Sequence, residues 1–476
     1  FDWRVFRAGA TLSLENEGSR RTLHWVPDDT ESSYVLPIAG EVRFIGDLPD
    51  GFLRSTLEPV IDVRALLPMG GRRVARRQLR VVDGEGNAIV RLVVERSTIV
   101  DGSSAPVGEP ITAVRVSGGS DPESVHDEVV ERLRTAGATA VPAGHELAEA
   151  AAAMGRTPGD YSSKLRLSLE PDQRADAALQ AILAHLLATV RANVDGVLAD
   201  IDTEFLHDLR VATRRARSAL AQVKGVLDEG ATAALRNELA WLGSVTNPCR
   251  DLDVYLHEMD GFRQQLGPAA GDLDPFHRVL ERDRRKALGV VRRALRSARF
   301  SRLVDGWEDV VSSPPDSGQE PFNAARPVVD VAGERISKAY RRMVKRGSKL
   351  GDDPPPEALH RLRIDGKKLR YLLEFFARLY EPQVVSRLVK ELKQLQDILG
   401  GFNDMTVQQA RLVEFAEELM ASEEARAETL LAMGRLAASM GRRQDELYHG
   451  FAKAFAAFAS PNSQQRYESF FPGVEM

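Results

Sequence analysis

The chain has 476 residues, of which 43% are hydrophobic and 28% are charged. One hydrophobic core rarely serves such a length, so the sequence predicts two or three domains, and the composition excludes fibrous and disordered proteins. The net charge of -5 excludes a polycation that coats nucleic acid indiscriminately. Any site for an anion must therefore be local.

The cysteine and histidine content limits the chemistry. Cys249 is the single cysteine, which excludes an internal disulfide and a zinc site made of several cysteines, and which fits a reducing cytoplasm. The seven histidines outside the motif described below show no spacing that favours a metal site. We therefore expect no metal ion and no cofactor.

The apolar runs of the chain do not predict a membrane span. The run at residues 177–190 is interrupted by Gln180 and His185 and is shorter than a bilayer span. We therefore expect no membrane as a partner. Phe1 is not a methionine and the first residues already resemble strand and turn, so we expect the natural amino terminus to lie before it.

Residues 1–155 have the pattern of an α+β domain rich in antiparallel strands. Two runs rich in β-branched residues, 78–82 and 88–94, flank a glycine-containing turn signal, which predicts a β-hairpin. Alternation at residues 111–116 predicts a further strand, and a helical period over residues 124–135 predicts a helix.

The remainder of the chain, residues 161–476, is predicted to be helical. From about Pro171, apolar residues recur at helical spacing through segments rich in Ala, Leu, Arg and Glu. A segment rich in Ser and Pro, residues 312–318, divides this part in two, and residues 352–356 mark another helix start. The pattern predicts two helical bundles.

The two helical parts carry one motif. In the first part it consists of His207, Arg210, Arg214, Arg215 and Arg217. Shifted by 153 positions, it consists of His360, Arg363, Lys367, Lys368 and Arg370. The same shift places residues 250–254 on residues 403–407 without a gap. This agreement indicates an internal duplication, with pseudo-symmetric repeats at about 165–311 and 321–465, each a bundle of about four helices.

Most of the motif lies on one face of a helix that turns about 100° per residue. The first stripe is defined by His207, Arg210, Arg214 and Arg217. The second stripe is defined by His360, Arg363, Lys367 and Arg370. The opposite, apolar faces comprise Leu209, Ala216, Leu220 and Val223, and Leu362, Leu369, Leu373 and Phe376. Arg215 lies about 100° from Arg214 along the helix, and Arg215, Lys368 and Lys224 form a second tier of candidates.

A single basic stripe is most often the solvated face of an amphipathic helix. Solvated faces usually mix charges of both signs, however, and two matched stripes headed by histidine favour a binding function. If the repeats pack about a pseudo-two-fold axis, both stripes reach one channel, where an anion relieves the cost of unpaired positive charge. Arginine, lysine and histidine together favour a phosphate ligand.

The stripes favour an anion without bases over single-stranded nucleic acid. Aromatic residues make up 6% of the chain, and Tyr371 is the one aromatic residue on a stripe on which a base would stack. RNA bound through its backbone, and an acidic partner protein, remain open alternatives. We expect binding to strengthen below about pH 6.5, where His207 and His360 gain charge beside the bound anion, although neighbouring arginines oppose their protonation in the empty site.

Three acidic residues lie close to the stripes in the sequence. Asp251 and Asp404 occupy equivalent positions in the repeats and either orient stripe arginines or cap helices, and we favour the cap. Glu374 falls on the second stripe, where we expect it to pair with Arg370.

The paired His-Arg-Lys motifs resemble the signature of the CHAD family, the conserved histidine α-helical domain, from about Tyr161 to the carboxy terminus. The resemblance implies two pseudo-symmetric four-helix bundles that face each other across a basic channel. It also implies polyphosphate binding by the residues of both stripes, and a cytoplasmic location at polyphosphate granules.

The amino-terminal part resembles the CYTH family of triphosphate tunnel metalloenzymes. The resemblance implies a closed β-barrel, and in that family a late strand carries two carboxylates and a lysine. The corresponding segment, residues 111–118, has neither. Since such carboxylates hold the catalytic metal, we expect no catalytic residues here and favour a non-enzymatic protein. A metal-dependent triphosphatase tethered to polyphosphate is the alternative.

Overall fold

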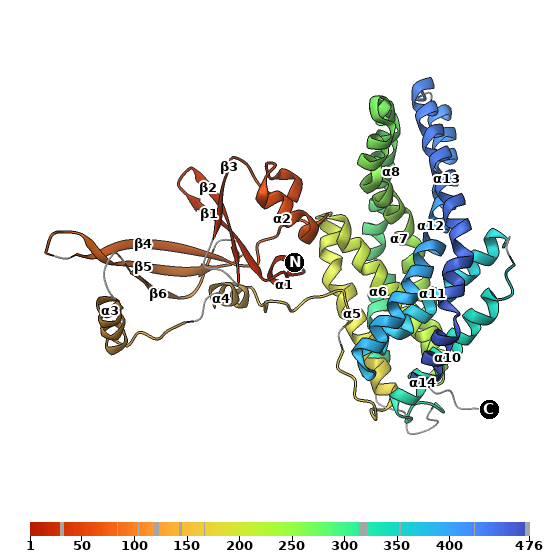
Figure 1. Cartoon of the computed structure of the whole chain (residues 1–476), viewed down its shortest axis with the longest axis horizontal. Coiled ribbons are helices and arrows are strands. Elements are labelled where there is room, and N and C mark those ends of the chain that lie inside the picture. Colours follow the sequence, from red (N-terminus) through yellow and green to blue (C-terminus); the bar gives the residue numbers. More distant parts are fainter. Residues whose placement is uncertain are drawn as a thin grey trace. The chain divides into compact units, whose positions relative to one another are not determined.

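The computed structural model describes residues 1–28, 33–82, 84–101, 105–118, 123–141, 145–165, 167–313, 321–351, 354–422 and 424–471. It divides into two compact units, Phe1–Ser162 and Ser163–Met476. The first contains β-sheets with short helices, and the second is almost entirely helical (Figure 1).

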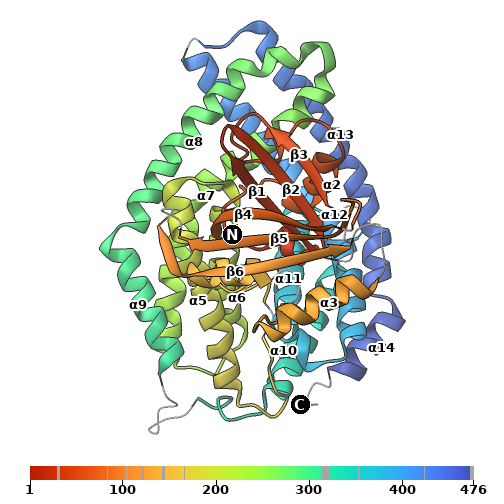
Figure 2. The ribbon, with the colours of Figure 1, turned by 90° about the vertical axis from the view of Figure 1, so that its left-hand side faces the viewer.

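Two three-stranded antiparallel sheets form the first unit. One consists of β1 (Ala10–Glu17), β2 (Arg20–Pro27) and β3 (Tyr34–Ile38), and the other of β4 (Gly71–Val82), β5 (Ala88–Val100) and β6 (Pro106–Gly118). The strands of the two sheets run in crossed directions (Figure 2). The helices of this unit are α1 (Arg4–Arg7), α2 (Phe52–Ile61), α3 (Glu123–Thr135) and α4 (His145–Ala153).

The predicted hairpin, third strand and helix of this unit are confirmed. β4 pairs with β5, β5 pairs with β6, and α3 packs on β5 and β6. Asp83, in the predicted turn, lies outside the described residues. Alternate apolar side chains explain the packing of β2, because Leu23 joins Leu53 and Leu57 of α2 in a small core.

The closed barrel implied by the CYTH resemblance is wrong for the described residues, whose two sheets remain separate. Barrel strands alternate between a filled interior and the outside. Residues 75–80 of β4 are exposed on both faces, so this strand encloses no interior. The sheets are instead tied by charge, since the Arg76 guanidinium pairs with Glu15 of β1 and, at 2.7 Å, with Glu95 of β5.

The helical unit repeats one series of helices. The first repeat comprises α5 (Ala175–Ala199), α6 (Thr203–Gln222), α7 (Glu229–Leu266), α8 (Asp274–Leu295) and α9 (Ala298–Ser312). The second comprises α10 (Val328–Gly347), α11 (Pro356–Phe375), α12 (Pro382–Ala421), α13 (Ala427–Phe458) and α14 (Pro461–Phe470). The helices α10, α11, α12 and α13 begin 153 positions after α5, α6, α7 and α8, respectively. Residues 314–320, Asp352 and Asp353, where the sequence predicts a break and a helix start, lie outside the described residues.

Local sequence explains where these helices begin. Asp202 caps α6 by accepting from the backbone N–H groups of Glu204 and Phe205, and Asp228 caps α7 through that of Ala231. The second repeat uses proline in the first turn of α11 and α12 instead, where a missing N–H costs nothing.

The two repeats pack about a pseudo-two-fold axis. α5 contacts its counterpart α10, α6 contacts α11, and α8 contacts α13, as expected of a self-complementary interface. The Tyr255 hydroxyl of α7 donates to the Gln408 carbonyl of α12 at 3.0 Å, and these two residues occupy equivalent positions. The axis therefore passes close to this contact.

The two repeats share a hydrophobic core. Tyr255 of the first repeat packs edge-on against Phe415 of the second with ring centroids 5.7 Å apart, and Phe276 packs on the same ring in a tilted arrangement at 5.4 Å. Buried residues of α7, α8, α12 and α13 continue this core along the long helices.

α5 is long and apolar enough to cross a membrane by length and composition alone. Half of its most apolar stretch is buried within the helical unit, where α5 packs on α6 and α9. These are the properties of a core helix. The apolar run noted in the sequence thus belongs to the centre of the first repeat.

The close approach of α5 and α6 depends on Gly196. A Cβ atom at this position would lie 2.1 Å from Cδ1 of the buried Phe205. We expect Gly196→Ala to destabilise the helical unit by about 1–3 kcal/mol in urea unfolding. Gly434→Ala on α13 is the matched control, since nothing lies within 4 Å of its Cβ, and it should stabilise by about 0.5–1 kcal/mol through helix propensity. Equal effects of the two substitutions would contradict this packing.

Candidate functional site

Burial confirms the predicted helical phase of both stripes. All eight residues of the apolar faces opposite the stripes are at most 5% exposed. α6 and α11 therefore bury their apolar faces, and the cationic side chains of the opposite faces are half-buried or exposed.

The two stripes lie next to each other because α6 contacts α11. The Arg214 Nε donates to the Tyr371 hydroxyl at 2.7 Å. The positive charge of Arg214 also acts on Lys367, its counterpart in the second repeat. The structure thus brings the centres of both stripes together near the pseudo-two-fold axis.

Neutral groups of α7 hold Arg210 of the first stripe. Its Nη1 donates to the Gly243 carbonyl at 2.9 Å and the Thr246 hydroxyl at 2.7 Å, and its Nη2 donates to Asn247 at 2.7 Å. Asn247 in turn donates to the carboxylate of Asp251 at 2.6 Å. Within the described residues, no residue of the first stripe forms a direct ion pair with a carboxylate.

Acidic and amide groups of α12 hold the second stripe. The Arg363 Nη2 lies 3.0 Å from the Asp404 Oδ1, and the His360 Nδ1 lies 2.5 Å from the Asn403 Oδ1. The cap interpretation of Asp251 and Asp404 is therefore wrong, since both lie within long helices and act on stripe arginines, Asp251 through Asn247. Each aspartate was expected at a helix start, but α7 and α12 begin more than five turns earlier.

Glu374 links the two helices. Its carboxylate accepts from Arg370 at 2.6 Å, as predicted, and also from Arg215 of α6 at 2.9 Å. Arg215 donates further to the Ser163 carbonyl at 2.9 Å. Arg215 therefore has a structural role between the repeats.

The other candidates are more exposed. Lys368 lies 4.0 Å from Asp365, which neutralises part of its charge. Arg217 is exposed beside Gly243 of α7, and Lys224 is exposed just beyond the end of α6. Arg217 is the better placed of these for a ligand that follows the first stripe.

Burial, and then neighbouring positive charges, lower the pKa values of three stripe residues, namely His207, Arg210 and Lys367. Burial, and then the charges of Arg250 and other arginines, lower the pKa of His207 to about 4. Burial and the charges of Arg363 and Arg214 lower that of Lys367 to about 8. Burial and neighbouring cations therefore oppose protonation of His207 in the ligand-free protein, as expected from the arginines beside it, and its gain of charge beside a bound anion stays a prediction.

Three site residues were not among the sequence candidates. Arg250 acts on His207 through its charge, Asn247 positions Arg210, and Asn403 contacts His360. The alignment of Arg250 with Asn403 between the repeats was the available signal. The sequence offered no such signal for Asn247, because its counterpart in the second repeat is Gly400, which has no side chain to match it.

Within the described residues, no group of three or more His, Cys, Asp or Glu side chains is arranged to hold a metal ion. Burial raises the pKa of the Cys249 thiol to about 12, so this cysteine remains protonated at neutral pH. The described site consists of cations and their hydrogen-bond partners.

Comparison with known proteins agrees with this geometry. The family model of the CHAD domain matches residues 181–413, which include both stripes and the segments of α7 and α12 that hold them. The helical unit matches the CHAD domain over residues 181–413. The crystal structure of the CHAD domain from the plant Ricinus communis is 26% identical to this chain, with a TM-score of 0.51, and covers 62% of this chain and 96% of that domain.

Two proteins of Mycobacterium tuberculosis, the uncharacterized proteins MT2285 and Rv2226, are also similar to the chain. Each is 30% identical over 299 residues, which is 61% of this chain and 54% of the relative. The chain therefore spans about half the length of these curated relatives.

Lys367 generates a prediction about stability. Because its folded-state pKa is about 8 rather than 10.5, the unfolded chain binds more protons between these values, and the wild-type unit gains stability as the pH rises through them. We expect Lys367→Met to stabilise the unit by about 1–2 kcal/mol at pH 7 and low salt, allowing for solvent screening. Urea unfolding at pH 7 and at about pH 10 measures the free energy of unfolding of the wild type and of the variant. The excess stability of the variant over the wild type should be smaller at the higher pH.

Lys368→Met is the control for this prediction. Lys368 lies near Asp365, so its removal loses an attraction rather than a repulsion. Stabilisation by both substitutions, or destabilisation by Lys367→Met, would contradict the conclusion that the half-buried charge of Lys367 among other cations destabilises the unit.

Proposed function

We propose that the CHAD domain binds inorganic polyphosphate along the two stripes of α6 and α11. The observation that carries the proposal is the gathering of cations in two adjacent stripes, where burial and then neighbouring positive charges lower the pKa of both His207 and Lys367. A protein retains such unfavourable charge when a ligand compensates it. A linear polyanion suits the arrangement, because each stripe extends for about 15 Å along its helix.

The chemistry of the side chains supports phosphate as the anion. Arg214, Arg217 and Arg370 offer planar donors that match phosphate oxygens, and Lys367 adds a compact charge. Tyr371, the aromatic residue of the second stripe, already accepts a hydrogen bond from Arg214. Stacking of several bases is therefore poorly supported, which favours polyphosphate over RNA.

We further propose that the protein is not an enzyme and is located at polyphosphate granules in the cytoplasm. The absence of carboxylates from residues 111–118, now seen on β6, supports the first part. A tethered CYTH-type triphosphatase is the second candidate. Phosphate release from triphosphate with magnesium or manganese would establish that candidate instead.

Direct binding tests the proposal. We expect long-chain polyphosphate to bind the full chain more tightly than RNA of similar total charge at the same ionic strength. Both affinities should fall with salt, with a log-log slope of about -0.7 per phosphate contacted in a single-stranded polyanion. A filter-binding titration at three salt concentrations measures this. Equal affinity for both ligands would indicate a general polyanion surface.

Substitution of a stripe arginine locates the contact. Arg214→Ala should weaken polyphosphate binding by at least about tenfold, because a charge-assisted contact contributes about 1.5–3 kcal/mol. Arg361→Ala is the matched control, since Arg361 is exposed on α11 about 100° from His360, off the stripe. Its effect should stay below about threefold, as for a screened charge.

Arg215→Ala is unsuitable as the off-stripe control, because Arg215 joins the repeats through Glu374. The dissociation constants of the Arg214 and Arg361 variants should be compared at one fixed salt concentration, after circular dichroism shows unchanged helicity. Equal losses of polyphosphate affinity in the two variants would mean that the stripes act only through their overall electrostatic field.

A further inference from the structure

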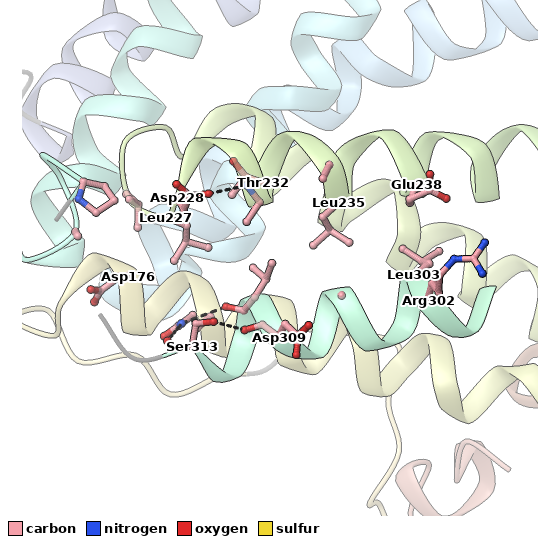
Figure 3. Close-up of a pocket in the computed structure, with 18 residues that line it drawn as sticks. Asp176, Leu227, Asp228, Thr232, Leu235, Glu238, Arg302, Leu303, Asp309 and Ser313 are labelled. Carbon is pink, nitrogen blue, oxygen red and sulfur yellow. Dashed lines mark hydrogen bonds between the residues drawn. The ribbon is translucent and has the colours of Figure 1, made fainter. Parts of the chain in front are cut away.

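A cavity of about 530 Å³ lies in the first repeat, away from both stripes. Its described lining comes from α5, α7 and α9 and the segments that adjoin them (Figure 3). The volume falls in the range of about 300–1,000 Å³ that is typical of small-ligand pockets.

The lining of this cavity combines apolar side chains with carboxylates. Leu235 of α7 and Leu303 of α9 line the apolar part (Figure 3). The lining also includes one cation, Arg302, and four carboxylates, those of Asp176, Asp228, Glu238 and Asp309. This excess of negative charge favours a cationic ligand and opposes polyphosphate.

Three of these carboxylates already have partners. Asp176 pairs with Arg174 at 2.6 Å, Glu238 pairs with Arg299 at 2.7 Å, and Asp228 caps α7. Asp309 is exposed in the last turn of α9 and forms no described ion pair. The carbonyl end of a helix carries partial negative charge, which adds to that of Asp309. A cation is thus best placed at this end of the cavity.

The second repeat shows what fills the equivalent space. α14 packs on α10 there, as α9 packs on α5. Tyr380, the counterpart of Leu227 in the cavity wall, contacts the fully buried Phe471 with ring centroids 4.7 Å apart. The Tyr380 hydroxyl also donates to the carbonyl of Val329, the counterpart of Asp176. Two aromatic rings therefore occupy the place that the smaller Leu227 leaves open in the first repeat.

We propose that the cavity of the first repeat binds a cationic aryl group. The ring would occupy the space that Phe471 fills in the second repeat, and the ammonium or guanidinium group would lie near Asp309. Two sources carry this chemistry: a free arylalkylamine, or neighbouring aromatic and basic side chains of a partner protein. The site is independent of the stripes, because its lining residues lie outside both.

The experiment uses 2-phenylethylamine as the probe and the full chain as the protein. Ligand-observed NMR and calorimetry should detect binding of 2-phenylethylamine, and much weaker binding of phenylacetate, which has the same ring and the opposite charge. A blocked tetrapeptide containing phenylalanine and arginine forms the second arm. Tighter binding of the peptide than of the amine assigns the site to a partner protein, and the reverse assigns it to a small amine.

Two variants test the location. Leu227→Tyr introduces the residue of the second repeat and should abolish binding of 2-phenylethylamine by filling the cavity. Asp309 lies on the surface, so Asp309→Asn should leave the fold intact. It should weaken binding of 2-phenylethylamine about threefold to tenfold while leaving polyphosphate binding unchanged. Undetectable binding to the wild type, equal binding of phenylacetate, or no effect of Asp309→Asn would overturn the proposal, even if Leu227→Tyr failed to fold.

Discussion

Repulsion between cations on α6 and α11 is the constraint on which the helical unit depends. The two helices meet near a pseudo-two-fold axis, so a charge on one repeat faces its own counterpart on the other. The fold tolerates this because each helix buries a continuous apolar face, and because α7 and α12 supply hydrogen-bond acceptors. Glu374 then bridges Arg215 and Arg370 across the repeats.

The two repeats manage this repulsion differently. Arg210 is held by a carbonyl, a hydroxyl and an amide, whereas its counterpart Arg363 is held by the carboxylate of Asp404. The first stripe therefore keeps more of its positive charge, and the second is partly neutralised by the protein itself. The two repeats thus differ in how their cations are compensated, although the two motifs are nearly identical in sequence.

The sequence was most informative where periodicity decides the structure. The phase of the stripes followed from the positions of apolar residues such as Leu209 and Leu362, because burial of one face dictates how a helix turns. Contacts between distant segments were less accessible. The link from Arg215 to Glu374 and the low pKa of His207 depend on how α6, α7 and α11 pack, which no local pattern encodes. The barrel implied for the amino-terminal unit failed for a similar reason, since pairing between sheets is a long-range property.

The shared core of α7, α8, α12 and α13 bears on how such a chain arose. A single repeat would expose Phe276 and Tyr255, which in the full chain pack against Phe415. An ancestor of half the length would have buried these rings only by pairing with a second copy of itself. Fusion of the two copies made that association permanent and freed each half to change independently, so one polypeptide now carries the asymmetry that a homodimer cannot evolve.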